Sequence, residues 1–192
     1  MKKFTTVTLS AITVYLIMAF VPRLEKNEPV TVLRTKITPE LISSKIEPIT
    51  IELKGHDAFL SKLGNFESGN DYKKVNRYGY MGKYQFGEQA LEQVNIEVPK
   101  QIFLNSPELQ EIAMQRLLKF NDDTLEKYIS KYEGKKLHGV LVTRSGVLAA
   151  AHLGGPTNVK KWFRSGKVFK DGNGTPITKY MKVFGGYSLD IE

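Results

Sequence analysis

Glu67 is the side chain in this sequence whose position suggests proton-transfer chemistry. It lies in the stretch GNFESGNDYKKVNRYGYMGKYQFG, residues 64–87, just before a Gly69-Asn70 pair that is typical of a helix end. A carboxylate at a helix end is usually solvated, but Phe66 and the tyrosines that follow could partly desolvate Glu67 and favour its protonated form. A protonated glutamic acid can donate a proton to a glycosidic oxygen, so this stretch suggests general acid catalysis.

Aromatic side chains follow Glu67 at alternate positions, namely Tyr78, Tyr80, Tyr84 and Phe86. In an extended strand these rings would share one face, with Lys83 and Gln85 on the other. Two interpretations fit this row. The rings could belong to the core, or some of them could line a cleft and support the flat apolar faces of sugars. Glycines at positions 79, 82 and 87 would let the backbone turn tightly or approach a ligand.

Helical periodicity supplies the elements that must position these residues. A first helix is expected from His56 to the Gly69-Asn70 stop, with Glu67 in its last turn. Further helices are expected at residues 88–94, 106–120, 125–133 and 140–153, and after residues 157 and 175. Ser106, Thr157 and Thr175 are the expected caps. The result is a mainly α (α+β) fold with one small extended region.

One of these helices is expected to carry a buried apolar stripe. The stripe consists of Leu109, Ile112, Ala113, Leu117 and Phe120. Residues 140–153 are almost all apolar, so that helix is expected to be central.

The N-terminal region predicts export. Lys2 and Lys3 precede an apolar stretch, residues 4–21, that is diluted only by threonine and serine. Because about 18 apolar residues is the lower limit for a membrane helix, residues 1–22 are interpreted as a signal peptide or a signal anchor, and residues 4–21 could hold the chain in the membrane. Prolines interrupt residues 23–54, which are interpreted as a linker with a short strand at 49–53. Residues 55–192 are expected to form one catalytic domain.

Composition restricts the partners and cofactors. The net charge of +8 favours an anionic partner, and export disfavours nucleic acid. The absence of cysteine excludes disulfides, a thiol nucleophile and thiolate zinc sites. No metal or other cofactor is expected, because the KDGNG stretch at residues 170–174 lacks the alternating acidic ligands of a calcium loop. His56, His138 and His152 lie far apart in sequence. A monomer is expected.

Four motifs, in order, resemble the lysozyme-like superfamily, specifically goose-type lysozymes and lytic transglycosylases. They are ESGNDY, GYMGKYQFG, AAAHLGGPTNVKKW and TPITKYMKVF, and the resemblance covers residues 56–187. It implies a lysozyme-like fold in which a small extended or β segment lines a cleft. It also implies that Glu67 is the catalytic acid/base. The substrate-binding residues expected beside it are Ser68, Tyr80, Gln85, Phe86, His152 and Tyr180, of which Tyr180 is implied to contact the region of the glutamate.

Two residues of the third motif depart from the family pattern, and KYQF in the second motif replaces the commoner LMQ. His152 stands where the family usually has tyrosine, and it could be a hydrogen-bonded core histidine or a cleft residue. Leu153 stands where the family usually has an asparagine that touches substrate. This second departure is the best support for an inactive peptidoglycan-binding scaffold.

The resemblance implies cleavage of the β-1,4 bond between N-acetylmuramic acid and N-acetylglucosamine in peptidoglycan, in the periplasm or cell envelope. A single glutamate suffices in lytic transglycosylases, whereas many glycosidases use two carboxylates. Asp71 is the candidate second carboxylate, or else a turn residue. The expected function is therefore a lytic transglycosylase, and a hydrolytic muramidase with the same cleft is the alternative.

Overall fold

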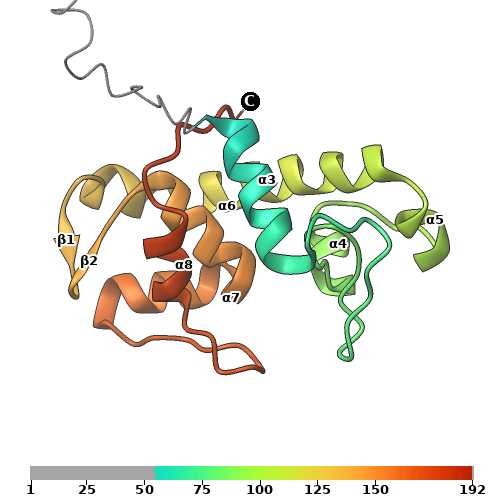
Figure 1. Ribbon diagram of the computed structural model, residues 1–192. Coiled ribbons are helices and arrows are strands. Elements are labelled where there is room, and N and C mark those ends of the chain that lie inside the picture. The colour runs from blue at the N-terminus through green and yellow to red at the C-terminus, as the bar shows by residue number, and fades with distance from the viewer. Residues whose placement is uncertain (1–54, 192) are drawn as a thin grey trace, which may run out of the picture. The chain divides into compact units, whose positions relative to one another are not determined.

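The computed structural model describes residues 55–191, and this part of the chain is mainly helical with a small antiparallel sheet (Figure 1). The elements are α3 (His56–Ser68), α4 (Glu88–Gln93), α5 (Lys100–Leu104), α6 (Pro107–Tyr132), β1 (Lys136–Leu137), β2 (Val140–Leu141), α7 (Arg144–Ser165) and α8 (Ile177–Val183). The mainly α prediction is confirmed at this level. The predicted leader, linker and strand at 49–53 lie outside the described residues.

Helix α3 ends where the sequence predicts, and it places Glu67 in its last turn. Gly69 adopts a left-handed conformation with a φ of 78°, and its backbone N–H donates to the carbonyl of Asn65 at 3.0 Å. The N–H of Asn70 reaches the carbonyl of Gly64 at 3.0 Å. This pattern satisfies the last free carbonyls of the helix, so glycine at 69 stops the helix directly after Ser68.

Helix α6 is the longest element, and its buried face differs in part from the predicted stripe. The buried positions recur at helical spacing, namely Gln110, Ala113, Met114, Leu117, Leu118, Asn121, Asp122, Leu125 and Ile129. Ile112 is 44% exposed. It was wrongly assigned to the core, because it precedes Ala113 by about 100° around the helix and therefore points toward solvent.

Residues 140–142 are not the start of the central helix, contrary to the prediction. Val140 and Leu141 instead pair with β1, across a turn in which His138 and Gly139 both have positive φ values, 46° and 79°. A two-residue turn of this kind matches the twist of a hairpin, so Val140 and Leu141 beyond it form a strand. Helix α7 begins at Arg144, where the side chain of Thr143 accepts the N–H of Gly146 at 3.2 Å.

The predicted break near Gly154 is present, and Ser106 occupies the N-cap position of α6, but the predicted side-chain caps do not form. Helix α7 is kinked at Gly155, whose φ of 73° and ψ of 154° are not helical. Across the described residues, no side chain among Ser106, Thr157 and Thr175 caps a helix. Ser106 Oγ donates backwards to the carbonyl of Ile102 at 2.8 Å, so this short polar side chain bonds locally to the preceding turn instead.

Helix α3 stands between two groups of elements (Figure 1). On one side lie α4, α5 and the loop of residues 70–87, and on the other lie α7, α8 and the β1–β2 hairpin. Helix α6 runs behind both groups and packs on α5 and α7. The buried core includes Phe59, Leu63, Leu148 and Trp162. Among the described residues, no helix is long and apolar enough to cross a membrane.

Candidate active site

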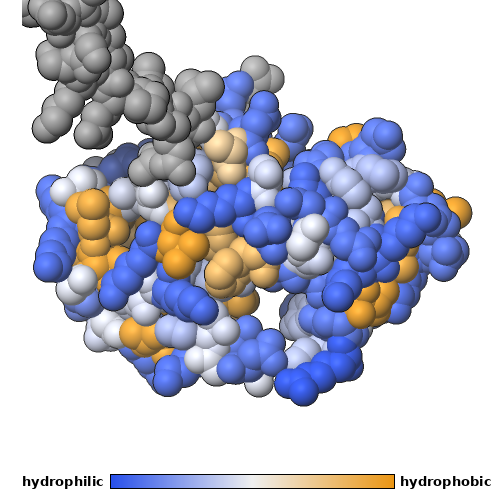
Figure 2. Space-filling view, viewed as in Figure 1, coloured by the Kyte–Doolittle hydropathy of each residue, from blue (hydrophilic) through white to orange (hydrophobic). Residues whose placement is uncertain are grey.

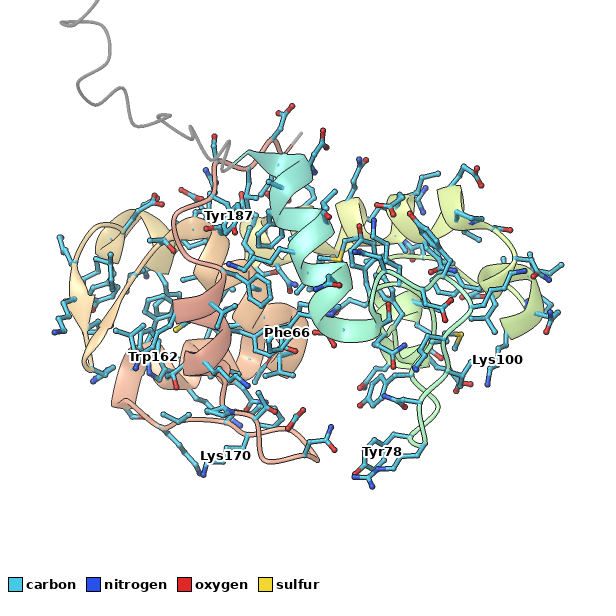
Figure 3. All side chains as sticks on the ribbon, viewed as in Figure 1. Phe66, Tyr78, Lys100, Trp162, Lys170 and Tyr187 are labelled. Atoms are coloured by element: carbon cyan, nitrogen blue, oxygen red, sulfur yellow. The ribbon has the colours of Figure 1, made fainter. Side chains whose placement is uncertain are left out.

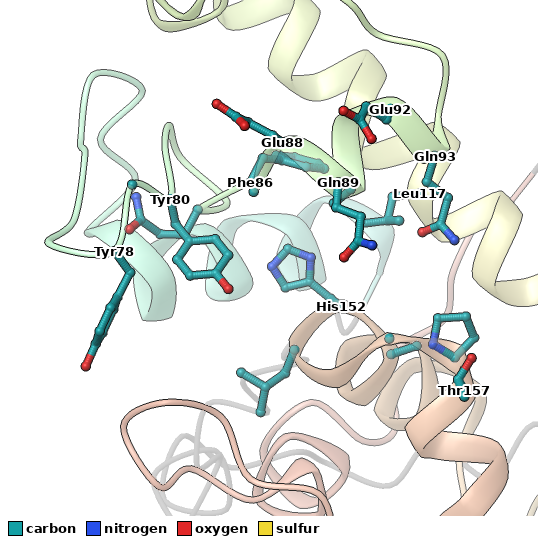
Figure 4. A pocket seen from close by; sticks show the side chains of 18 residues that line it. Tyr78, Tyr80, Phe86, Glu88, Gln89, Glu92, Gln93, Leu117, His152 and Thr157 are labelled. Atoms are coloured by element: carbon teal, nitrogen blue, oxygen red, sulfur yellow. The ribbon is translucent and has the colours of Figure 1, made fainter.

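Glu67 faces a cleft between the two groups of elements. The section of the cleft beside it, about 260 Å³, is also lined by Asp171, Gly172 and Asn173 from the loop before α8. A larger section of about 920 Å³ continues between α4 and the kink of α7 (Figure 4). The two sections share the lining residues Tyr78, Tyr80, Gln85, His152 and Leu153. They therefore form one extended cleft with Glu67 at one end.

The Glu67 carboxylate is mostly buried, and the side chains of Tyr180 and His152 lie beside it. Its side chain is 14% exposed, and Tyr180 Oη donates to Glu67 Oε1 at 2.6 Å. His152 Nε2 lies 3.7 Å from the same oxygen. Within residues 55–191, no lysine or arginine forms a salt bridge with Glu67. The carboxyl group is therefore largely screened from water and is held on the cleft wall by Tyr180 and His152.

Tyr180 reaches Glu67 from the buried face of α8. Its side chain is 3% exposed, and burial raises the pKa of its hydroxyl above the ordinary value. The negative charge of Glu67 and the hydrogen bond to it act in the same direction. Tyr180 therefore stays protonated and can orient the Glu67 carboxyl group throughout the neutral range. Phe66 packs edge-to-face on Tyr180 at 5.3 Å but is 42% exposed and does not line the cleft, so it does not cover Glu67 as expected.

The Tyr180→Phe variant should lose less stability at alkaline pH than the wild type. Tyr180 has a raised pKa in the folded protein, so above about pH 10 the unfolded chain binds fewer protons at this residue and stability falls by about 1.4 kcal/mol per pH unit. Phenylalanine removes this contribution. Urea unfolding at several pH values between 9 and 11 measures the slope. Tyr80→Phe, at an exposed ring, is the control, and equal slopes for wild type and Tyr180→Phe would contradict the assignment.

His152 is a cleft residue rather than a hydrogen-bonded core histidine. It comes from α7, its ring lies 6.0 Å from that of Phe86, and it lines both sections of the cleft. Its side chain is 7% exposed, and Nδ1 is buried without a hydrogen-bond partner among the described residues. Figure 4 shows His152 and Tyr80 entering the cleft from different elements. The side chain therefore packs against Glu67 through Nε2.

The aromatic row does not form one face of a strand. Tyr84 and Phe86 are fully buried, whereas Tyr78 and Tyr80 are 50% and 46% exposed and line the cleft. The chain reverses because Met81 pairs with Phe86 through two backbone hydrogen bonds of 2.9 and 2.8 Å. Gly82 and Gln85 turn the backbone between them with positive φ values of 78° and 52°. The reversal breaks the alternation, so both the core and the cleft interpretations hold for different rings.

A partly buried polar cluster anchors this hairpin to α6, and it was not predicted from the sequence. Glu111 accepts from Lys83 Nζ at 2.8 Å, Tyr72 Oη at 2.7 Å and Tyr84 Oη at 2.7 Å. Burial alone would raise the pKa of Glu111, but these hydrogen bonds outweigh it and hold the pKa below its ordinary value. Gln110, also on α6, accepts from the N–H of Lys83 at 2.8 Å. The partners are separated by up to 39 residues, so no local pattern could reveal the cluster.

Alanine at Gly82 should destabilise the hairpin more than alanine at Gly79. Both glycines have positive φ, which costs a residue with a Cβ atom about 1 kcal/mol. A Cβ at Gly82 would also overlap the side chain of Gln110, whereas one at Gly79 meets nothing within 4 Å. We expect Gly82→Ala to lower the free energy of unfolding by about 2 kcal/mol more than Gly79→Ala in urea titrations. Equal losses would show that Gln110 moves away without cost.

Two polar residues near the site, Ser68 and Asp71, make structural contacts. Ser68 Oγ donates to the carbonyl of Lys83 at 2.7 Å and accepts from the N–H of Asp71 at 2.9 Å. It ties α3 to the hairpin and does not line the cleft, contrary to the expectation of a substrate contact. Asp71 is exposed and accepts the N–H of Lys73 at 2.8 Å, which makes it a turn residue.

Asp171 is a second carboxylate on the cleft wall, and the sequence analysis considered it only as part of the KDGNG stretch. It lines the same section as Glu67, and its Oδ1 accepts from the N–H groups of Asn173 at 3.0 Å and Thr175 at 2.6 Å. These bonds hold the 171–174 loop in its turn. Among residues 55–191, no group of three or more histidine, aspartate and glutamate side chains could hold a metal ion.

The structure thus brings most of the expected site residues together. Five of them line the cleft, namely Glu67, Tyr80, Gln85, Phe86 and His152, and Tyr180 contacts Glu67 from behind. Comparison of the chain with protein-family models, with curated proteins and with solved structures finds no match. The chemistry of the site must therefore be inferred from its own geometry.

Proposed function

We propose that this protein is a lysozyme-like lytic transglycosylase that cleaves the β-1,4 bond between N-acetylmuramic acid and N-acetylglucosamine in peptidoglycan. The observation that carries the proposal is the Glu67 carboxyl group, which faces an extended cleft, is 14% exposed and is oriented by Tyr180 at 2.6 Å. A general acid needs access to the substrate together with partial removal from water, and this position supplies both.

The proposed reaction uses Glu67 twice and consumes no water. Protonated Glu67 first donates its proton to the glycosidic oxygen as the bond from C1 of the muramic acid to that oxygen breaks. The resulting carboxylate then takes the proton from the 6-hydroxyl of the same sugar as its oxygen bonds to C1. The 2-acetamido group of the sugar can stabilise the developing positive charge. The product is a 1,6-anhydro ring, and Glu67 is protonated again.

The walls of the cleft fit a polysaccharide. Tyr78 and Tyr80 expose their rings along it and can support sugar faces, while the side chains of Gln85, Gln89 and Gln93 can bond to hydroxyl and acetamido groups. The net charge of +8 favours approach to an anionic cell wall. The predicted export signal at residues 1–22 would bring the domain to that wall, in the periplasm or cell envelope, and residues 4–21 could keep it on the membrane.

A hydrolytic muramidase is the second candidate, and Asp171 favours it. This carboxylate lines the same section of the cleft as Glu67 and could activate a water molecule or stabilise positive charge. Against this role, Asp171 Oδ1 already accepts two backbone N–H groups. Leu153, which also lines the cleft, supports the third candidate, an inactive peptidoglycan-binding scaffold, because its apolar side chain cannot make the asparagine contact.

Digestion of purified peptidoglycan distinguishes the three candidates. The transglycosylase should release fragments with 1,6-anhydromuramic acid ends, which mass spectrometry separates from reducing ends by the mass of one water molecule. Reducing ends alone would establish a hydrolase. Binding to the wall without any released fragment would establish a scaffold.

A further inference from the structure

Two loops from opposite sides of the cleft touch each other beside Glu67. Arg77 Nη2 donates to Asn173 Oδ1 at 3.2 Å, and Tyr78 Oη donates to the same oxygen at 3.4 Å. Arg77 also lies over the Tyr78 ring at 4.7 Å and donates to its hydroxyl at 2.6 Å. We call these three residues the bridge. Figure 3 shows Tyr78 pointing toward the loop that follows Lys170.

The bridge crosses the cleft at the end that holds the carboxylate. Tyr78 and Asn173 line the same section of the cleft as Glu67. Tyr78 also lines the larger section, which runs along α4. Figure 2 shows a hollow at this place, above the tips of the two loops. An extended polymer lying along the cleft would pass between the bridge and α3. With the bridge closed, such a polymer cannot enter from the side and can only be threaded from an end.

Each loop is held by its own turn, while the contact between the loops is exposed. Asn76 Oδ1 accepts the N–H groups of Tyr78 at 2.9 Å and Tyr80 at 3.1 Å. Asp171 Oδ1 does the same for Asn173 and Thr175. These Asx-type turns fix the two tips. The bridge residues are all exposed, so water competes for their hydrogen bonds and the contact can open while both tips keep their shape.

We propose that the bridge is a gate that opens to admit a glycan strand from the side and then closes over it. Closure retains the strand beside Glu67, so Arg77, Tyr78 and Asn173 determine how long the protein stays on a strand. This inference rests on the proposed function, because it takes a peptidoglycan strand as the ligand. A closed loop around a polymer slows dissociation without adding contacts to the reacting sugars.

Cross-linking the bridge before or after loading tests the gate. The chain has no cysteine, so the Arg77→Cys/Asn173→Cys variant carries one reactive pair. The pair is joined with a reductively cleavable bismaleimide in a Glu67→Gln background, which prevents lysis of the wall. One sample is cross-linked and then mixed with purified sacculi, and a second is mixed first and cross-linked afterwards. Bound protein is measured after a wash in about 1 M salt, which screens surface charge.

The gate predicts a dependence on the order of addition. Protein cross-linked after mixing should remain on the sacculi through the salt wash and leave when the linker is reduced. Protein cross-linked beforehand should bind sacculi weakly yet still bind short soluble glycan fragments, which enter from an end. The Lys74→Cys/Arg77→Cys variant is the matched control, because its cross-link stays within one loop and should give no dependence on order.

The possible outcomes distinguish failure of the gate hypothesis from failure of the proposed function. Equal, salt-sensitive binding for both orders of addition would overturn the gate while leaving the proposed function intact. Equal salt-resistant binding for both orders would also overturn it, since the strand would then not need the opening. If the protein without cross-linker fails to bind sacculi at all, both the gate and the peptidoglycan function are wrong.

Discussion

The Glu67→Gln variant is expected to lyse purified peptidoglycan at least about 100-fold more slowly than the wild type, equivalent to about 2.7 kcal/mol of barrier. Glutamine cannot donate and recover a proton, yet it keeps the size of the side chain and can still accept the hydrogen bond from Tyr180 at Oε1. The fold should therefore be unchanged. Turbidity of sacculi measures the rate, and circular dichroism with thermal unfolding checks the fold.

Two aspartates provide controls for the Glu67 result. Asp71→Asn should retain near-normal lysis, because Asp71 is an exposed turn residue outside the cleft. Asp171→Asn preserves an oxygen that can accept the two backbone N–H groups but removes the charge. Near-normal lysis by this variant supports a single-glutamate reaction, whereas a loss comparable to that of Glu67→Gln would support hydrolysis with two carboxylates. A folded Glu67→Gln protein with wild-type lysis would exclude Glu67 as the acid.

The Glu111→Ala variant is expected to lose about 3 kcal/mol of unfolding free energy, because it leaves the ammonium group of Lys83 without its partner. The Lys83 side chain is 12% exposed, and Glu111 accepts three hydrogen bonds in the cluster. We take the lower end of the range for broken buried pairs, since Glu111 itself is 29% exposed and water can reach part of the vacated site. Urea unfolding at neutral pH measures the loss.

A second ion pair on the same helix is the matched control. Lys119 and Asp123 form an i,i+4 pair at 3.2 Å with both side chains largely exposed. Asp123→Ala should change stability by less than about 0.5 kcal/mol. The double variant Lys83→Met/Glu111→Leu should recover part of the loss, because no ammonium group is then left without a partner, while the buried hydroxyl of Tyr84 still lacks its acceptor. A loss for Glu111→Ala as small as that for Asp123→Ala would show that water replaces the cluster.

The Glu111 cluster stabilises the fold and also positions part of the cleft wall. It fixes the hairpin of residues 81–86 on α6, and this hairpin carries Gln85 and the backbone that Ser68 joins to the end of α3. The end of α3 in turn carries Glu67. Glu111 and Gln110 thus act as positioning residues for the cleft wall although neither lines it.

Local chemistry explains which elements could be predicted. The end of α3 follows from one glycine in the left-handed conformation, and the start of α6 from proline at its first position, so both were correct. The expected side-chain cap bonds were wrong, although Ser106 has the N-cap position, because a serine hydroxyl can instead bond backwards to the preceding turn, as that of Ser106 does. Residues 140–142 were misassigned because apolar runs suit a helix or a strand equally, and the turn at His138 and Gly139 decided between them.

The candidate site also combines features that the sequence predicted with features that only tertiary packing determined. The sequence predicted that Glu67 lies at a helix end and is followed by a segment rich in tyrosine and glycine, because a helix stop and residue types are local properties. The direction of each ring after Glu67 depended on backbone reversals at Gly82 and Gln85, which alternation along a strand cannot represent. The contact of Glu67 with Tyr180 joins residues 113 apart, and the bridge joins residues up to 96 apart. Packing of α8 against the end of α3 made the first contact, and the approach of the 171–174 loop to Arg77 and Tyr78 made the second. Tertiary packing thus turned a carboxylate at a helix end into a mostly buried group on the wall of a cleft.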